Sequence, residues 1–296
     1  MDWAPDQKAL GGLGLAGVCR ETCRVIHRVM LPNFVHLGPP LLSAALLLAN
    51  SAAVRALSDL DHCPSLLADR LAFSLFATVS VGAGLLLLLL CAAAYAFCVA
   101  SLYSTGGDLL AADRVLRGFP TAPLARLACT FLILAAAPFL LVHASLSFAA
   151  LFHPQELVSA PGKTVLPVRL LAWAACLAGA GYVAVVCQLA CVVSLLEDAV
   201  LLGALRKSRA LLAGKFWAAA GVFVTLDGCI FAVLVAFQAL VVDDALGLGL
   251  GFQVAAGVVM AVALCAVVLL TLVAQPVVYM VCKNHHYQVV HKVHLD

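Results

Sequence analysis

One stretch, residues 190–216, contains the pattern that most constrains the fold: two apolar runs joined by a short amphipathic segment, ACVVSLLEDAVLLGALRKSRALLAGKF. Glu197 and Asp198 begin the segment, where the positive end of a helix dipole favours carboxylates. Gly214 is expected to end it. Basic residues lie near its end, where a helix dipole favours cations: Arg206, Lys207 and Arg209. The pattern predicts a membrane helix, a helix lying along the membrane surface, and a second membrane helix.

Composition also indicates a membrane protein. Of the 296 residues, 65% are hydrophobic and 11% are charged, whereas soluble domains contain about a quarter charged residues. Such a chain cannot cover a water-facing surface, so the lipid bilayer is its expected partner. The formal net charge of +2 is too small to indicate a nucleic-acid partner.

Apolar runs long enough to cross a membrane, which takes about 20 helical residues, occur six times. The predicted spans are 34–56, 71–104, 122–151, 167–196, 216–242 and 249–282. A cytosolic arm and amphipathic helix, 1–33, precede them, a loop at 57–70 joins the first two, and a polar, His-rich tail, 283–296, follows the last. Lysine and arginine in the short connections fall mostly on the side of the N-terminal segment, so both termini are predicted to be cytosolic. The endoplasmic reticulum and the plasma membrane fit this pattern equally.

The N-terminal amphipathic segment, 16–31, has a basic face and an apolar face. Arg20, Arg24 and Arg28 stand four residues apart on one face. The other face contains Val18, Thr22, Val25, Ile26 and Val29. The basic face predicts binding of anionic lipid headgroups or cytosolic proteins, since a basic residue near an anionic membrane gains about 1 kcal/mol. An equally open interpretation is that the charges only enforce topology.

The order of segments repeats along the chain. Residues 98–103, CVASLY, end the second predicted span, and residues 191–196, CVVSLL, end the fourth. Each is followed by an amphipathic segment with an arginine near its end, a glycine, an aromatic residue and a new span, and residues 28–34 match the second half of this unit. The predicted fold is an all-α integral membrane protein with six transmembrane helices and three cytosolic amphipathic interfacial helices, arranged as three parallel repeats.

Asp227 is the candidate site residue within a predicted span. An ionisable group at this depth costs about 2.5–3.5 kcal/mol on insertion scales and is by default a functional hypothesis. Gln188 and His143 are candidate partners at comparable depth. The alternatives are a small-solute or proton-coupled transporter that uses Asp227, and an interhelical hydrogen bond that only fixes packing.

The C-terminal histidines do not have the defined spacing of zinc ligands. They are His285, His286, His291 and His294, close to Cys282. We therefore expect no metal site, and no sequence pattern indicates a cofactor. Neither a His-Glu-x-x-His nor a Cys-x-x-Cys motif is present in the sequence, and we expect no enzymatic activity.

Two stretches resemble a plant family of uncharacterised multi-pass transmembrane proteins. They are residues 189–215, LACVVSLLEDAVLLGALRKSRALLAGK, and residues 277–288, VVYMVCKNHHYQ. Some members of that family are loosely labelled as binding a polyadenylate-binding protein. The unit of span, surface helix and span is more distantly similar to bacterial membrane domains that accompany glycerophosphodiester phosphodiesterases. Neither resemblance implies catalytic residues. The predicted function is a non-enzymatic membrane protein that organises lipids or partner proteins at the cytosolic face, with transport as the alternative.

Overall fold

The computed structural model describes residues 10–29, 38–62, 67–104, 125–131, 165–197, 199–243, 247 and 249–293. Regular structure in these ranges is helical throughout, which confirms the all-α class. The elements are α2 (Leu15–Val29), α3 (Gly38–His62), α4 (Leu67–Ser104), α8 (Val165–Leu196), α9 (Leu202–Leu212), α10 (Phe216–Phe237), the π-helical η2 (Gln238–Val242) and α11 (Leu250–Val293). Residues 125–131 are also helical.

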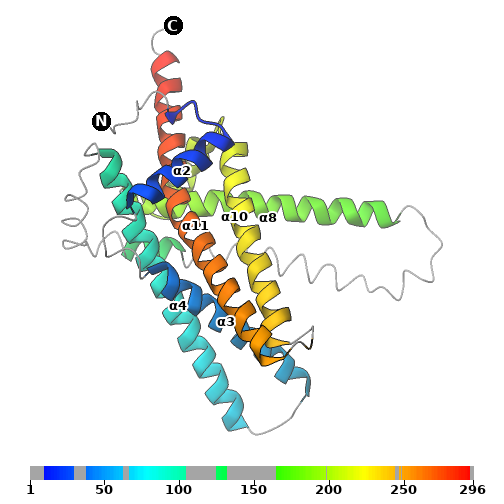
Figure 1. Ribbon diagram of the computed structural model, residues 1–296. Coiled ribbons are helices and arrows are strands. Elements are labelled where there is room, and N and C mark those ends of the chain that lie inside the picture. The colour runs from blue at the N-terminus through cyan, green and yellow to red at the C-terminus, as the bar shows by residue number, and fades with distance from the viewer. Residues whose placement is uncertain are drawn as a thin grey trace.

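α11 is the central helix of the molecule. It packs against α2, α3, α4, α8, α9 and α10. α10 lies antiparallel to α11, and α3 and α4 form a second antiparallel pair beside them (Figure 1). α2 lies near the beginning of α10 and across α11, whose C-terminal part extends beyond it (Figure 1). Large side chains of the fully buried core come from several of these helices, among them Tyr279, Phe223 and Leu42.

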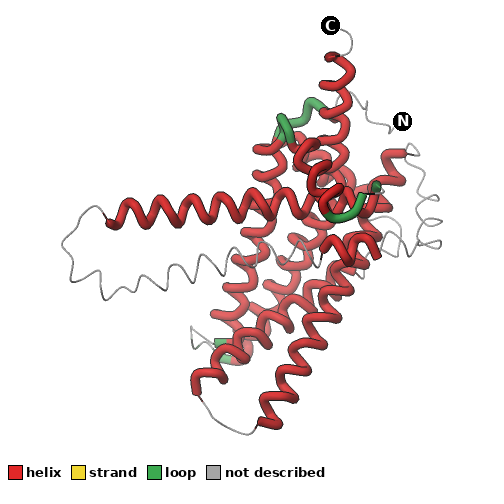
Figure 2. Tube along the Cα trace, turned by 180° about the vertical axis from the view of Figure 1, so that it is seen from behind, coloured by secondary structure: helices red, strands yellow, loops and turns green. Residues whose placement is uncertain are grey.

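α8 has a different direction from its neighbours. It lies across α10 and α11, and its N-terminal part extends away from the other helices (Figures 1 and 2). The buried residues of α8 lie in its C-terminal part, from Val185 to Leu195, among the residues that the structure describes. The predicted fourth span is therefore a helix at the expected place in the sequence, but it does not run parallel to the other long helices.

Four described helices contain segments long and apolar enough to cross a membrane. The segments are Leu86–Tyr103, Ala178–Leu196, Phe216–Val242 and Leu250–Val289. Two of these helices also expose apolar stripes, which include Val224, Phe231 and Val235 on α10 and Val254, Val258 and Val262 on α11. A lipid environment accommodates such stripes, and helices satisfy their own backbone hydrogen bonds there. These features fit an integral membrane protein. The predicted third span, 122–151, lies outside the described residues except for 125–131.

Several helices extend beyond their predicted limits. α3 continues to His62 and α4 begins at Leu67, so the loop predicted at 57–70 is wrong for most of its length. α11 continues to Val293, so the polar tail predicted from residue 283 is helical over most of its length. The reason is that hydropathy identifies only the apolar part of a helix, and the same helix continues into polar residues on either side of that part.

The two described surface helices have the faces that their periodicity predicts. In α2, Val18, Thr22 and Val25 are buried, and Arg20 and Arg24 are exposed. The side chains of Arg28 and Val29 lie outside the described residues. In α9, the buried residues are Ala204, Ser208, Leu211 and Leu212, and the exposed basic residues are Arg206, Lys207 and Arg209. Gly214 follows α9 with a φ of 86°, a conformation that suits glycine.

One detail of the α9 prediction is wrong. α9 begins at Leu202 with no acidic residue in its first turn, and Leu201 in the N-cap position makes no side-chain cap. Glu197 lies just after the end of α8 and outside the first turn of α9. Asp198 lies outside the described residues. Glu197 has long-range partners instead.

Candidate functional site

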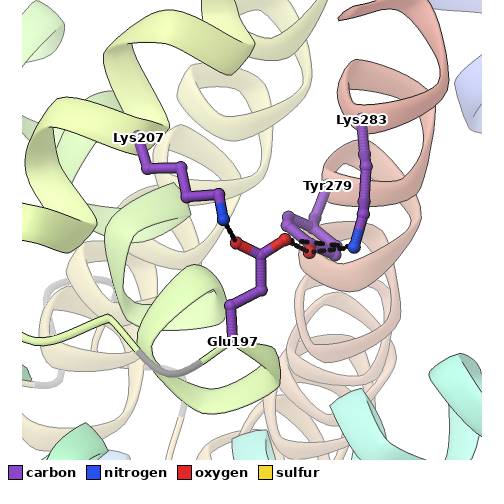
Figure 3. A network of polar contacts seen from close by, with 4 residues as sticks. All are labelled: Glu197, Lys207, Tyr279 and Lys283. Carbon is purple, nitrogen blue, oxygen red and sulfur yellow. Dashed lines mark hydrogen bonds and ion pairs between the residues drawn. The ribbon is translucent and has the colours of Figure 1, made fainter. Parts of the chain in front are cut away.

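Glu197 is the centre of a polar network where α8, α9 and α11 meet (Figure 3). Tyr279 Oη donates a hydrogen bond to Glu197 Oε1 over 2.5 Å. Lys283 Nζ lies 3.0 Å from the same carboxylate oxygen and also donates to Tyr279 Oη over 3.0 Å. Lys207, from α9, forms an ion pair with the other oxygen, Oε2. One carboxylate therefore connects the end of α8 to both α9 and α11.

The electrostatic environment keeps Glu197 ionised. Its side chain is only 13% exposed, and burial by itself raises the pKa of a carboxyl group. Hydrogen bonds from Lys207, Tyr279 and Lys283 act in the opposite direction and outweigh burial, so the pKa of Glu197 is below its usual range. The network therefore consists of one carboxylate, two lysine side chains and a tyrosine hydroxyl that contacts both Glu197 and Lys283.

A second carboxylate–tyrosine contact attaches α2 to α4. Tyr103 Oη, near the end of α4, donates to Glu21 Oε1 over 3.1 Å. Arg24, one turn further along α2, lies 3.7 Å from Glu21 Oε2. Glu21 is buried, so this contact lies between the helices. We refer to Glu21, Tyr103 and Arg24 as the α2 contact and to Glu197, Lys207, Tyr279 and Lys283 as the Glu197 network.

The two surface helices lie at the same end of the molecule. Lys215 Nζ, just after α9, donates to the backbone carbonyl of Leu13, just before α2, over 3.0 Å. Among the predicted basic residues, Arg24 and Lys207 form ion pairs. The others whose side chains are described, Arg20, Arg206 and Arg209, are exposed and form no ion pair within the described residues.

The structure brings Asp227 and Gln188 together, as expected from their comparable depth within the predicted spans. Gln188 Nε2, on α8, donates to Asp227 Oδ2, on α10, over 2.6 Å. Gln188 Oε1 is buried without a partner. Gln188 and Gln275 also line a cavity of about 250 Å³ whose other described lining residues come from α4, α8 and residues 125–131. His143, the other candidate partner, lies outside the described residues.

Of the C-terminal histidines, His285 packs against another part of the chain. His285 lies on α11, and a Cβ added at Gly214 would be 2.9 Å from His285 Nε2, so this ring packs closely against the turn after α9. Within the described part of the chain, no group of three or more His, Cys, Asp or Glu side chains is placed to hold a metal ion. His291 is on α11 with an undescribed side chain, and His294 lies outside the described residues.

Sequence reasoning missed the residues that make the polar contacts. It treated Glu197 as a local helix-start signal and did not single out Glu21, Tyr103, Tyr279 or Lys283. A usable signal was the tyrosine within an apolar run followed four residues later by a lysine, at 279 and 283. These two residues share a helix face, and a buried tyrosine hydroxyl usually has a hydrogen-bond partner.

Comparison with known proteins places the chain in a family. No curated protein and no solved structure matches the chain. A family model described as a domain of unknown function, DUF8558, matches residues 49–296. The match includes α4, α8, α9, α10 and α11, and with them the Glu197 network and the pair of Asp227 and Gln188. Because it covers most of the sequence, the chain belongs to the DUF8558 family.

Proposed function

We propose that this protein is a non-enzymatic integral membrane protein that gathers anionic lipids at its cytosolic face. The observation that supports the proposal is that α2 and α9 lie at one end of the bundle and bury their apolar faces against it. Arg20, Arg206 and Arg209 are exposed there and form no described ion pair. A helix of this kind suits the headgroup layer, where basic side chains meet lipid phosphates and carboxylates.

The proposed topology has six spans and both termini in the cytosol. Two parts of the described structure have the same order of helices, and this supports the proposal of three parallel repeats. α2 precedes the antiparallel pair α3 and α4, and α9 precedes the antiparallel pair α10 and α11. The positive-inside rule then assigns the end with α2 and α9 to the cytosol. The membrane that contains the protein is the endoplasmic reticulum or the plasma membrane.

Lipid preference in reconstituted vesicles tests the proposal. Brominated phosphatidylserine or brominated phosphatidylcholine is mixed into the bilayer, and quenching of tryptophan fluorescence reports which lipid lies beside the protein. Trp217, which is exposed at the start of α10, is next to the basic end. The wild type should prefer phosphatidylserine. The triple variant Arg20→Gln, Arg206→Gln, Arg209→Gln should lose most of this preference, since each basic residue near the surface contributes about 1 kcal/mol.

The control variant removes the same charge from the predicted opposite side: Arg70→Gln, Lys163→Gln, Arg169→Gln. It should keep the wild-type preference. An unchanged preference in the Arg20, Arg206 and Arg209 variant would contradict the proposal. Transport would then be the better candidate function, with Asp227 and Gln188 as its site, beside the cavity that Gln188 lines.

A further inference from the structure

Two cysteines share an exposed face of α2. Cys19 and Cys23 are four residues apart, both are exposed, and both are free thiols. Leu15, one turn before Cys19, continues the same stripe and is 48% exposed. Residues at four-residue steps on a helix lie nearly above one another. The stripe borders the buried face of α2 on one side, and Arg20 and Arg24 lie toward the other side of the helix.

The stripe adjoins an exposed apolar surface of α10. A Cβ added at Gly221 would lie 3.1 Å from Leu15 Cδ1, so Leu15 rests directly on α10. Trp217 and Val224, one turn before and after Gly221, are 85% and 57% exposed. Phe231 and Val235 continue this exposed apolar surface along α10. A hydrocarbon chain attached near Leu15 could follow it into the bilayer.

We infer that Cys19 and Cys23 are S-acylated, each receiving a long fatty acyl chain from acyl-coenzyme A. The cysteine sulfur bonds to the acyl carbonyl carbon, the bond from that carbon to the coenzyme A sulfur breaks, and coenzyme A leaves as a thiol with the cysteine proton. The product is a thioester at the membrane surface. Cysteines on amphipathic or juxtamembrane helices are sites of this modification.

The acyl chains would fix α2 in the headgroup layer. An acyl chain and neighbouring basic residues act together as two membrane signals, and each buried methylene of the chain adds to the attraction. Arg20 would then stay close to anionic headgroups. The inference rests on the proposed function for one point, the cytosolic placement of α2, since acyl-coenzyme A is supplied from the cytosol.

Metabolic labelling tests the inference. The full chain is expressed in cultured eukaryotic cells with an alkyne analogue of palmitate, and labelled protein is measured before and after hydroxylamine, which cleaves thioesters. The wild type should carry hydroxylamine-sensitive label, and Cys19→Ser, Cys23→Ser should reduce it to background. The control Cys129→Ser, Cys229→Ser removes two other exposed thiols, which lie within predicted spans, and should keep the label. Absence of label in the wild type, or label retained in the Cys19 and Cys23 variant, would overturn the inference.

A second measurement separates this inference from the proposed topology. After hydroxylamine treatment, sealed vesicles of known orientation are exposed to a membrane-impermeant maleimide, with the Cys19 and Cys23 variant as the blank. Reaction from the cytosolic side without any acyl label would overturn S-acylation and support the proposed placement of α2. Reaction from the opposite side only would overturn both.

Discussion

The α2 contact and the Glu197 network use the same chemistry for different purposes. Both place a carboxylate against a tyrosine hydroxyl, at 3.1 Å for Glu21 and 2.5 Å for Glu197. The cation beside Glu21, Arg24, comes from its own helix. The cations beside Glu197, Lys207 and Lys283, come from two other helices. The first arrangement attaches one surface helix to α4, whereas the second connects three elements through one side chain.

The largest difference should appear when each carboxylate is neutralised. Glu197→Gln removes the counter-ion of both Lys207 and Lys283 and should cost about 2–3 kcal/mol, since hydrogen bonds to charged groups contribute about 1.5–3 kcal/mol. Glu21→Gln should cost about 1 kcal/mol or less, because it removes a single ion pair, in which the Arg24 nitrogen and the Glu21 oxygen are 3.7 Å apart. Thermal unfolding in detergent measures both changes. Equal losses of stability in the two variants would contradict the expected difference between the two sites.

A smaller difference should separate the two tyrosines. The hydroxyl of Tyr279 donates to Glu197 and accepts from Lys283, and the residue is 1% exposed. Tyr279→Phe should therefore cost about 1–2 kcal/mol, and Tyr103→Phe about 1 kcal/mol or less. The same thermal unfolding assay applies, with both variants read against the wild type. A greater loss of stability for Tyr103→Phe than for Tyr279→Phe would show that the α2 contact, not the Glu197 network, is the stronger of the two.

Acidification should produce the smallest change in stability of the three tests. The pKa of Glu197 is lower in the folded protein than in the unfolded chain, so its stabilisation is fully present above the ordinary carboxyl pKa of about 4.3. This stabilisation declines as the pH falls through the lowered pKa. The difference in melting temperature between wild type and Glu197→Gln should be constant near neutral pH and shrink below about pH 4. A difference that shrinks already between pH 7 and 6 would contradict a lowered pKa.

The sequence predicts features of this fold that depend on neighbouring residues. Helix periodicity identifies the buried faces of α2 and α9, and the φ of 86° at Gly214 agrees with its predicted place after α9. The predicted span 216–242 coincides with α10 and η2. These features depend on residues within a few turns of one another, so hydropathy and spacing are sufficient to find them.

Features that depend on distant residues could not be predicted in this way. Glu197 and Tyr279 are 82 positions apart in the sequence, and no local pattern pairs them. α8 packs against α4, α9, α10 and α11, and its own composition does not indicate its direction. The contact of Asp227 with Gln188 was anticipated because an acid deep in a span needs a polar partner and few are available at that depth. The exposed cysteines of α2 were not singled out. Most other cysteines of the chain lie within apolar runs, where cysteine behaves as a small hydrophobe.

α11 is much longer than a membrane crossing requires. Its 44 residues measure about 66 Å at about 1.5 Å per residue, more than twice the roughly 30 Å of a bilayer core. Tyr279, held by Glu197, divides the helix into arms of about 44 Å and 21 Å. Pro276, three residues before Tyr279, removes a backbone hydrogen bond beside this point. The Glu197 network therefore holds α11 within one turn of this proline, and the longer part of the helix runs from there to the Leu250 end.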